Sequence, residues 1–308
     1  MNATVLPTTI PDYLEQLRRS LAGADPALVQ DALYDAEEYL RSELSENPGK
    51  SEAEVIASVA GSYGAPDEVA EIYRDTEVKV QSALRTPPAR PVAAQRSLLA
   101  RFFGVIAEPR TYASLFYMLL ALATGIFYFT WVVTGLSMSA GFAVLIIGVP
   151  FVILYFGSVK VLSLVEGRIV ETMLGERMPR RPLYSTRGKP LLERIKELFT
   201  DPRTWATQLY FLMMLPLGIA YFTVAVTGLA TSLGLIAAPI AAVFGAAEIG
   251  GLWIDDVNVL SVSGWWALPL CFLAGVLLLF ATLHLARGVG YLHGQLAKHM
   301  LVKTSQYD

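Results

Sequence analysis

Long stretches without charged side chains fill the chain from residue 98 onward, and short polar segments separate them. No Asp, Glu, Lys or Arg occurs between Arg110 and Lys160, or between Arg203 and Glu248, and a final apolar run covers residues 265–286. A bilayer core requires about 20 apolar residues per span, and lipid forces an open chain to be helical there. The pattern therefore predicts four transmembrane helices, the first two joined by a turn within residues 135–141.

The segment 232–247 is the apolar stretch that these four spans leave over. It has 16 residues, which is short for a span, and it contains Pro239. No Lys or Arg occurs between Arg203 and Arg287, and basic loops of membrane proteins stay in the cytoplasm. Four spans place every basic segment and both termini on the cytoplasmic side of the cell membrane. We therefore expect 232–247 to be a re-entrant or interfacial helix.

The apolar part of the chain repeats itself with an offset of 93 residues. Residues 108–136 align without gaps to residues 201–229, and 16 of the 29 positions are identical. Each copy begins with an acidic residue and Pro-Arg-Thr, which suit the cap and the first turn of a helix. We expect two tandem repeats, 98–187 and 188–308, each with an interfacial helix and two spans. The second repeat also carries a polar extracytoplasmic loop near 248–264.

The first 84 residues have apolar positions at helical spacing, with many acidic side chains between them. Helix-starting signals at Pro11, Asp25-Pro26, Ser51 and Pro66 predict four short helices. This part holds 6 Lys and Arg against 16 Asp and Glu, a net charge of −10, and the rest holds 18 against 11, a net +7. Residues 85–97 contain three prolines and read as a linker. The expected fold is all-α: an acidic cytoplasmic module at 1–84, a linker and a polytopic membrane domain.

Composition narrows the class of protein further. Hydrophobic residues make up 54% of the 308 residues and charged residues 17%, below the roughly 25% that is usual for soluble domains. Cys271 is the only cysteine, which excludes an internal disulfide and a cysteine-based metal cluster. The sequence has no P-loop, nucleophile-elbow, zincin or dinucleotide-binding motif. We therefore expect no catalytic activity, no cofactor, no metal and no nucleic-acid partner.

The N-terminal residues resemble the HAAS-type helical module of bacteria. The resemblance is carried by Tyr13-Leu14, the acidic run at 35–38 and Gly64-Ala65-Pro66. Residues 108–301 resemble the sensor domain that precedes histidine kinases in actinobacteria, through Thr111-Tyr112, Thr204-Trp205, Pro216-Leu217-Gly218 and the closing segment 285–301. No kinase domain is present in the 308 residues. The two resemblances imply a membrane-embedded signalling role and, because HAAS modules often accompany PadR-like regulators, a cytoplasmic partner of that kind.

Three groups of polar residues are candidates for a functional site. One recurs in both repeats inside apolar spans and predicts either helix packing or a lipid-binding cleft: Tyr117, Thr130, Thr134, Tyr210, Thr223 and Thr227. One lies in the polar loop and predicts either a cation site or a solvated loop anchored by tryptophan: Glu248, Trp253, Asp255, Asp256 and Asn258. The third group is basic. It predicts binding to anionic headgroups, attraction of the acidic module, or only the usual positive charge of a cytoplasmic loop: Arg177, Arg180, Arg181, Arg187 and Lys189. The histidines His284, His293 and His299 lack metal-ligand spacing, so we expect structural or interfacial roles for them.

These patterns favour a protein that senses a membrane or envelope state and relays it to a cytoplasmic regulator or a second copy of itself. The alternative is a transporter accessory subunit, or a protein that binds lipid or a hydrophobic ligand between its repeats. Because a short linker tethers the acidic module, we also expect the module to rest on the basic segment 177–189. Exposed ion pairs contribute about 0–1 kcal/mol each, so this docking is expected to be weak and lost at high salt.

Overall fold

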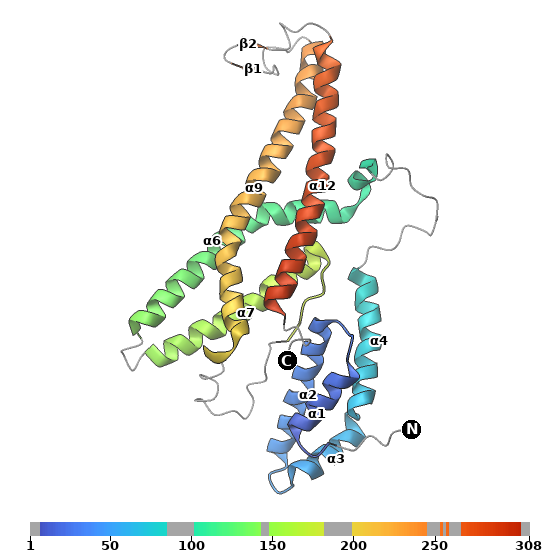
Figure 1. Cartoon of the computed structure of the whole chain (residues 1–308), viewed down its shortest axis with the longest axis vertical. Coiled ribbons are helices and arrows are strands. Elements are labelled where there is room, and N and C mark those ends of the chain that lie inside the picture. The colour runs from blue at the N-terminus through green and yellow to red at the C-terminus, as the bar shows by residue number, and fades with distance from the viewer. Residues whose placement is uncertain are drawn as a thin grey trace. The chain divides into compact units, whose positions relative to one another are not determined.

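The computed structural model describes residues 7–84, 102–142, 148–181, 199–244, 253–254, 257–258 and 266–302. Figure 1 shows that the regular elements of these parts are helices, apart from one very short hairpin. The all-α prediction is confirmed. In chain order the elements are α1 (Ile10–Ser20), α2 (Pro26–Glu46), α3 (Glu52–Ser62), α4 (Pro66–Leu84), η1 (Gly104–Ala107), α6 (Pro109–Phe142), α7 (Gly148–Leu174), α9 (Pro202–Val243), β1 (Trp253–Ile254), β2 (Val257–Asn258) and α12 (Ala267–Leu301).

Side-chain caps start the helices of the N-terminal module, the four-helix part formed by α1 to α4. Thr9 caps α1, and Asp25 caps α2 by accepting the backbone N–H of Ala27 at 2.9 Å, with Pro26 in the first turn. Ser51 and Glu54 form a complete capping box at α3. These groups satisfy backbone N–H groups that a helix start leaves without partners. The helix starts predicted from these capping signals are therefore present.

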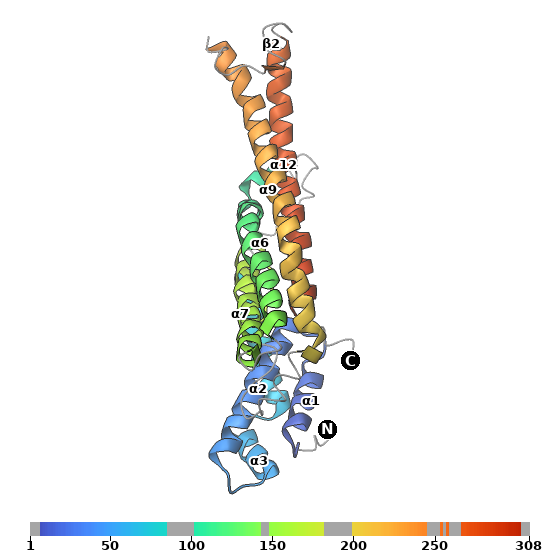
Figure 2. The same cartoon turned by 90° about the vertical axis from the view of Figure 1, so that its left-hand side faces the viewer.

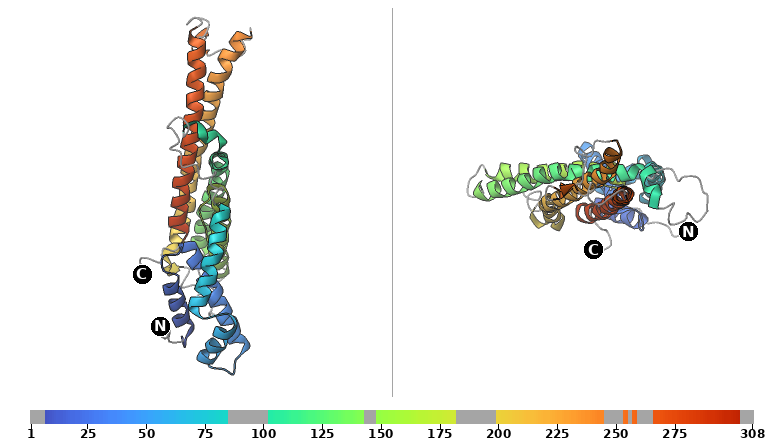
Figure 3. Two further views of the ribbon diagram at one scale, coloured as in Figure 1. Left: turned by 90° about the vertical axis from the view of Figure 1, so that its right-hand side faces the viewer. Right: turned by 90° about the horizontal axis from the view of Figure 1, so that it is seen from above.

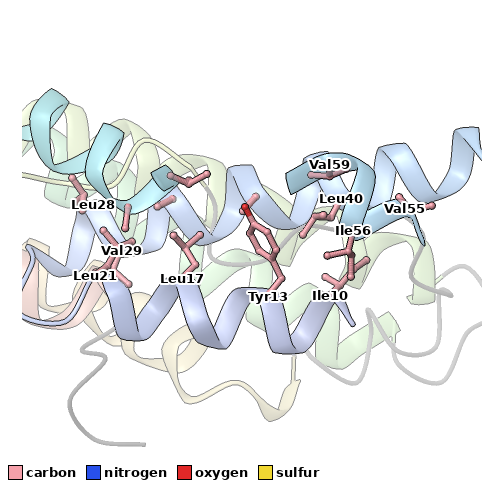
Figure 4. Packing of buried hydrophobic residues seen from close by; sticks show 14 residues of the cluster. Ile10, Tyr13, Leu17, Leu21, Leu28, Val29, Leu40, Val55, Ile56 and Val59 are labelled. Atoms are coloured by element: carbon pink, nitrogen blue, oxygen red, sulfur yellow. The ribbon is translucent and has the colours of Figure 1, made fainter. Parts of the chain in front are cut away.

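A single apolar cluster holds the module together. Figure 4 shows Ile10, Tyr13, Leu17 and Leu21 projecting from one face of α1 toward the other helices. Tyr13 is fully buried, and its hydroxyl donates to the carbonyl oxygen of Gly64 at 2.7 Å. Burial raises the pKa of Tyr13, so the hydroxyl stays protonated and remains a donor. Gly64 has a φ of 115°, which favours glycine, and it ends α3 where α4 must begin.

Four of the helices are long and apolar enough to cross a membrane: α6, α7, α9 and α12. Their most apolar windows have a mean hydropathy of 1.8 to 2.2. Most of each such window is exposed on the protein, with 22 to 33% buried. Apolar surface of this extent needs an apolar solvent, so the chain is a membrane protein.

Two expectations from the sequence differ from the structure. The predicted turn within 135–141 lies inside α6, which continues to Phe142, and Gly135 instead gives room to the ring of Tyr155 on α7. The segment 232–243 continues α9 without a break, as one helix of 42 residues that contains Pro216 and Pro239. A proline removes one backbone hydrogen bond but does not end a helix in an apolar environment. The rest of the segment expected to be re-entrant, 245–247, lies outside the described residues.

The chain divides into two compact units. Unit 1 comprises Met1–Pro91, Val132–Tyr210 and Gly294–Asp308, and unit 2 comprises Val92–Trp131 and Phe211–His293. Within unit 2, α9 and α12 lie side by side, as Figures 2 and 3 both show. The side chain of Thr282 on α12 packs directly against Gly228 of α9, which agrees with the role of small residues in bringing membrane helices together.

A reciprocal contact of two glycines joins α6 to α9 within unit 2. A methyl group added at Gly125 would overlap the carbonyl oxygen of Met214, and one added at Gly218 would overlap the carbonyl oxygen of Ala121. Gly218 follows Gly125 by 93 residues, and Met214 follows Ala121 by the same offset. The two repeats therefore cross through equivalent positions, and only glycine permits this approach of the two backbones.

Substitution of either glycine at this crossing should destabilise the membrane part. We expect Gly125→Ala or Gly218→Ala to cost about 1–3 kcal/mol, because the new methyl group has no space and backbone must move. Gly234→Ala is the matched control on α9, since nothing lies within 4 Å of an added Cβ there. Thermal unfolding of the full chain in detergent measures the difference. Equal stability of the Gly218 and Gly234 variants would contradict the crossing.

Candidate functional site

A buried arginine lies where the module meets the segment after α7. Arg177 follows Gly175, whose positive φ of 76° ends that helix, and its side chain is 8% exposed. The guanidinium contacts three carboxylates: Asp31 of α2 at 3.1 Å, Glu77 of α4 at 3.2 Å and Glu171 of α7 at 3.4 Å. We call these four residues the Arg177 cluster. Because its acids come from the module and from a membrane helix, the cluster ties the two parts together within unit 1.

Asp31 also fixes the path of the segment that carries the arginine. Its Oδ1 atom accepts the backbone N–H groups of Arg180 at 2.6 Å and Arg181 at 2.8 Å. Burial raises the pKa of the Asp31 carboxyl group, and these two N–H groups and Arg177 act against that rise. The carboxylate therefore depends on its three donors, because a buried charge that lacks partners is costly. One turn further along α2, Asp35 pairs with the Arg181 guanidinium at 2.7 Å.

The C-terminal end of α12 provides a second attachment for the module. Lys298 Nζ lies 2.5 Å from Oδ2 of Asp25, the residue that caps α2, and both side chains are largely buried. Asp25 therefore serves the helix with one carboxylate oxygen and the lysine with the other. The module is held at α2 by residues that follow α7 and by residues near the end of α12.

The basic residues predicted from the sequence divide into three kinds. Arg177 is buried, Arg180 and Arg181 are about half exposed, and Arg187 and Lys189 lie outside the described residues. The sequence predicted exposed ion pairs, and the structure instead buries the central guanidinium among carboxylates. Salt screens a buried pair much less than an exposed one, so we expect this contact to persist at salt concentrations that abolish surface pairs.

None of the three acids of the cluster is among the candidate site residues that the sequence provided, although Asp31 and Glu77 belong to the acidic module that was expected to rest on the basic segment. Glu171 lies next to Val170 and three residues before Leu174, and all three are buried at the end of a span. A carboxylate at such a position requires a partner, and that requirement is the signal that could have identified it. Glu77 has no comparable signal, because most of its neighbours on α4 are polar and exposed.

The six residues that recur in both repeats, predicted to pack helices or to frame a lipid-binding cleft, have different surroundings in the structure. The threonines are exposed on the outer faces of α6 and α9: Thr130, Thr134, Thr223 and Thr227. Hydroxyls one helical turn apart point the same way, so their recurrence marks a helix face. The two tyrosines are buried and have different partners. Tyr210 donates to Glu166 of α7 at 3.0 Å in unit 1, and Tyr117 contacts His293 at 2.6 Å in unit 2.

The histidines make polar contacts within the helical part of unit 2 and near the end of α12. His293 is 1% exposed, and its second ring nitrogen lies 3.3 Å from the hydroxyl of Tyr221. The Nε2 atom of His284 lies 3.0 Å from the carbonyl oxygen of Phe102. His299 accepts, through its backbone carbonyl, a hydrogen bond from Arg203 at 2.9 Å. Among the described residues, no group of three His, Cys, Asp or Glu side chains is placed to hold a metal.

The polar loop is described at four residues. Trp253 pairs with Asn258 and Ile254 pairs with Val257 in the antiparallel hairpin of β1 and β2. Glu248, Asp255 and Asp256 lie outside the described residues. The prediction of a cation site or a solvated loop at these positions stays a prediction.

Fold and site define a polytopic helical membrane protein with a four-helix module attached through a buried arginine. Residues 117–301 match the family described as "Putative sensor", and residues 12–72 match the family described as HAAS. The first match covers more than half of the chain, so the chain belongs to the Sensor family. No curated protein and no solved structure matches the chain. Both resemblances seen in the sequence are confirmed, and together they fit a signalling membrane protein.

Removing the buried guanidinium should release the module from α7. We expect Arg177→Gln to weaken docking by about 3–5 kcal/mol, because it leaves buried carboxylates without their cation. Arg180→Gln is the matched control, because that side chain is 52% exposed and lies 3.9 Å from Glu171. Its contact with Asp31 is made by the backbone N–H, which the substitution keeps. We expect this control to weaken docking by about 0–1 kcal/mol. Spin labels at the exposed positions Ser58 and Thr172, in a Cys271→Ser background, report the distance between module and α7. A distance distribution that Arg177→Gln leaves unchanged would contradict the role of the cluster.

Proposed function

We propose that the chain senses the state of the membrane and relays it to a cytoplasmic partner by holding or releasing its HAAS module. The Arg177 cluster carries this proposal, because one guanidinium depends on acids from α2, α4 and α7 at the same time. A movement of α7 that displaces Glu171 takes one carboxylate away from the buried guanidinium of Arg177. Such a charge tolerates little misalignment, so a small displacement changes the stability of docking.

The distribution of basic residues supports a cytoplasmic location for the module. Lys and Arg are absent from 111–159 and from 204–286, and four spans put all the remaining basic segments on one side of the membrane. The positive-inside rule assigns that side to the cytoplasm. In the proposed topology both termini, the Arg177 cluster and Lys298 are cytoplasmic, and the hairpin of β1 and β2 lies outside.

The proposed output is a binding event, with no catalytic step assigned to the chain. Release of the module uncovers the face of α2 that carries Asp31 and Asp35, both of which pair with arginines in the docked state. An acidic helical face of this kind suits a cytoplasmic regulator with a basic surface, of the PadR-like kind that accompanies HAAS modules, or a second copy of this chain. A ligand that favours one of two states shifts their populations by its difference in affinity, so the partner and the membrane act on the same equilibrium.

In-cell photo-cross-linking of the full chain tests the relay. A photoreactive residue at Ile72, which is 60% exposed on α4, reports what the module touches. We expect Arg177→Gln to increase cross-linking to one cytosolic protein, or to a second copy, several-fold over the unchanged chain. The reason is that the substitution raises the population with the module released.

The control variant is Arg180→Gln, which removes a neighbouring cation and preserves the cluster; its cross-linking should match that of the unchanged chain. A product that is equally abundant in the unchanged chain and both variants would separate partner binding from docking and overturn the relay. The absence of any specific product from the released module would overturn it as well.

A further inference from the structure

A small cavity in unit 1 lies between α2 of the module, α7 and the first turns of α9. It has a volume of about 40 Å³, and a single water needs about 10–15 Å³ of such space. The cavity therefore has room for one small polyatomic group, such as a phosphate. Its apolar wall includes Val159 and Leu164 of α7 and Leu301 at the end of α12.

Two cationic side chains line this cavity. Lys160 is the first charged residue after the apolar stretch of the first repeat, and Arg203 is the last basic residue before the apolar stretch of the second. Asp201 is a third charged group in the lining, and its Oδ1 accepts the backbone N–H of Arg203 at 3.0 Å, at the start of α9. The charges sum to +1. The start of a helix adds a favourable dipole for an anion.

Two buried polar atoms of the lining point to a ligand. Thr204 is 5% exposed and Gln30 is 8% exposed, and neither the Thr204 hydroxyl nor Oε1 of Gln30 has a hydrogen-bond partner among the described residues. The Gln30 amide cannot simply turn over, because its Nε2 donates to the carbonyl oxygen of Arg181 at 2.9 Å. The cavity thus offers cations, a hydroxyl that can donate and a carbonyl oxygen that requires a donor.

We propose that this cavity binds one phosphate group that carries a hydroxyl beside it. The phosphate oxygens accept from Lys160, Arg203 and the Thr204 hydroxyl, and the neighbouring hydroxyl donates to Oε1 of Gln30. Both a glycerol phospholipid headgroup and a free hydrogenphosphate have this chemistry. The cavity lies at the end of the apolar stretches, which is the depth of headgroup phosphates, and basic pockets at that depth bind anionic lipids.

Occupancy of the cavity should also stabilise the docked module, because Gln30 belongs to α2 and the two cations belong to the membrane helices. This consequence depends on the proposed function, whereas the binding itself does not. A phosphate group held from both sides adds a contact that exists only in the docked state. Lipid composition would then set how readily the module is released.

Binding is measured on the full-length protein with two probes. The first is nanodiscs of phosphatidylcholine with and without phosphatidylglycerol, followed by native mass spectrometry of the retained lipid. The second is inorganic phosphate, titrated calorimetrically into the protein in a phosphate-free detergent. We expect Arg203→Gln to weaken binding roughly tenfold, the loss of one charge-assisted hydrogen bond. We expect Thr204→Val to weaken it about fivefold, the loss of one neutral hydrogen bond, and Arg203→Lys to retain most of it.

The chain supplies its own matched controls in the Pro-Arg-Thr corner of the first repeat. Arg110→Gln and Thr111→Val change the same residue types in the same sequence context and should leave binding unchanged. Thermal unfolding without the probe identifies any variant that fails to fold, and for such a variant Arg203→Lys and Thr204→Val provide the comparison.

Selective retention of phosphatidylglycerol assigns the site to a lipid headgroup, and saturable binding of inorganic phosphate alone assigns it to a free anion. Equal behaviour of the unchanged chain, Arg203→Gln and Thr204→Val with both probes would mean that the cavity holds only water, and would overturn the proposal. If Thr204→Val weakens ligand binding while Arg177→Gln cross-links to the same extent as the unchanged chain, the results would support the binding site and contradict the relay.

Discussion

A guanidinium removed from water has to be compensated where it lies, and this requirement at Arg177 organises the part of unit 1 where the module meets α7. Asp31, Glu77 and Glu171 come from three helices that are separate along the chain, and all three contact the guanidinium of Arg177. The positions of α2, α4 and α7 are thereby coupled, since no one of them can move without leaving a charge uncompensated. The path from residue 177 to 181 follows from the same constraint, through the two backbone N–H groups that Asp31 accepts.

The module and the membrane helices are stabilised by different forces. In the module, an apolar cluster around Tyr13 and Leu17 is removed from water, which is the main driving force in aqueous solvent. Burial of apolar side chains adds little stability between helices that already lie in lipid. Such helices are held together by close approach of their backbones and by polar contacts. Gly125 and Gly218 provide the approach, and Tyr117 with His293 provides a polar contact. The Arg177 cluster lies at the junction of the two parts, since its acids come from α2 and α4 of the module and from the membrane helix α7.

Local signals in the sequence predict where the helices begin and which of them span the membrane. They do not predict which side chains meet in the folded chain. Asp25-Pro26 and the Ser51–Glu54 pair mark helix starts through bonds to neighbouring backbone, and charge-free stretches mark spans through length alone. The prediction for 232–247 is wrong over 232–243, because the short length of the segment and Pro239 both favour a separate element, whereas a membrane helix tolerates proline and α9 continues through it. Basic residues at 177–181 were predicted to meet the acidic module, but the burial of Arg177 depends on Glu77 and Glu171, whose proximity is a property of the tertiary fold. The recurrence of the threonines at 130, 134, 223 and 227 does not mark a shared buried site. These side chains are exposed, so the repeat reflects equivalent helix faces in the two copies.

The glycine crossing relates the two repeats by an exchange of equivalent positions. Gly125 meets Met214 as Gly218 meets Ala121, and every member of one pair lies 93 residues from its counterpart in the other. A contact that exchanges equivalent positions is the geometry of an isologous interface between identical subunits. Two separate copies of such a repeat would form the same contact as a homodimer, so the crossing agrees with an origin of the membrane part by duplication and fusion. In a single chain the two copies need not stay identical: the tyrosine shared by both repeats meets a histidine in one and a glutamate in the other.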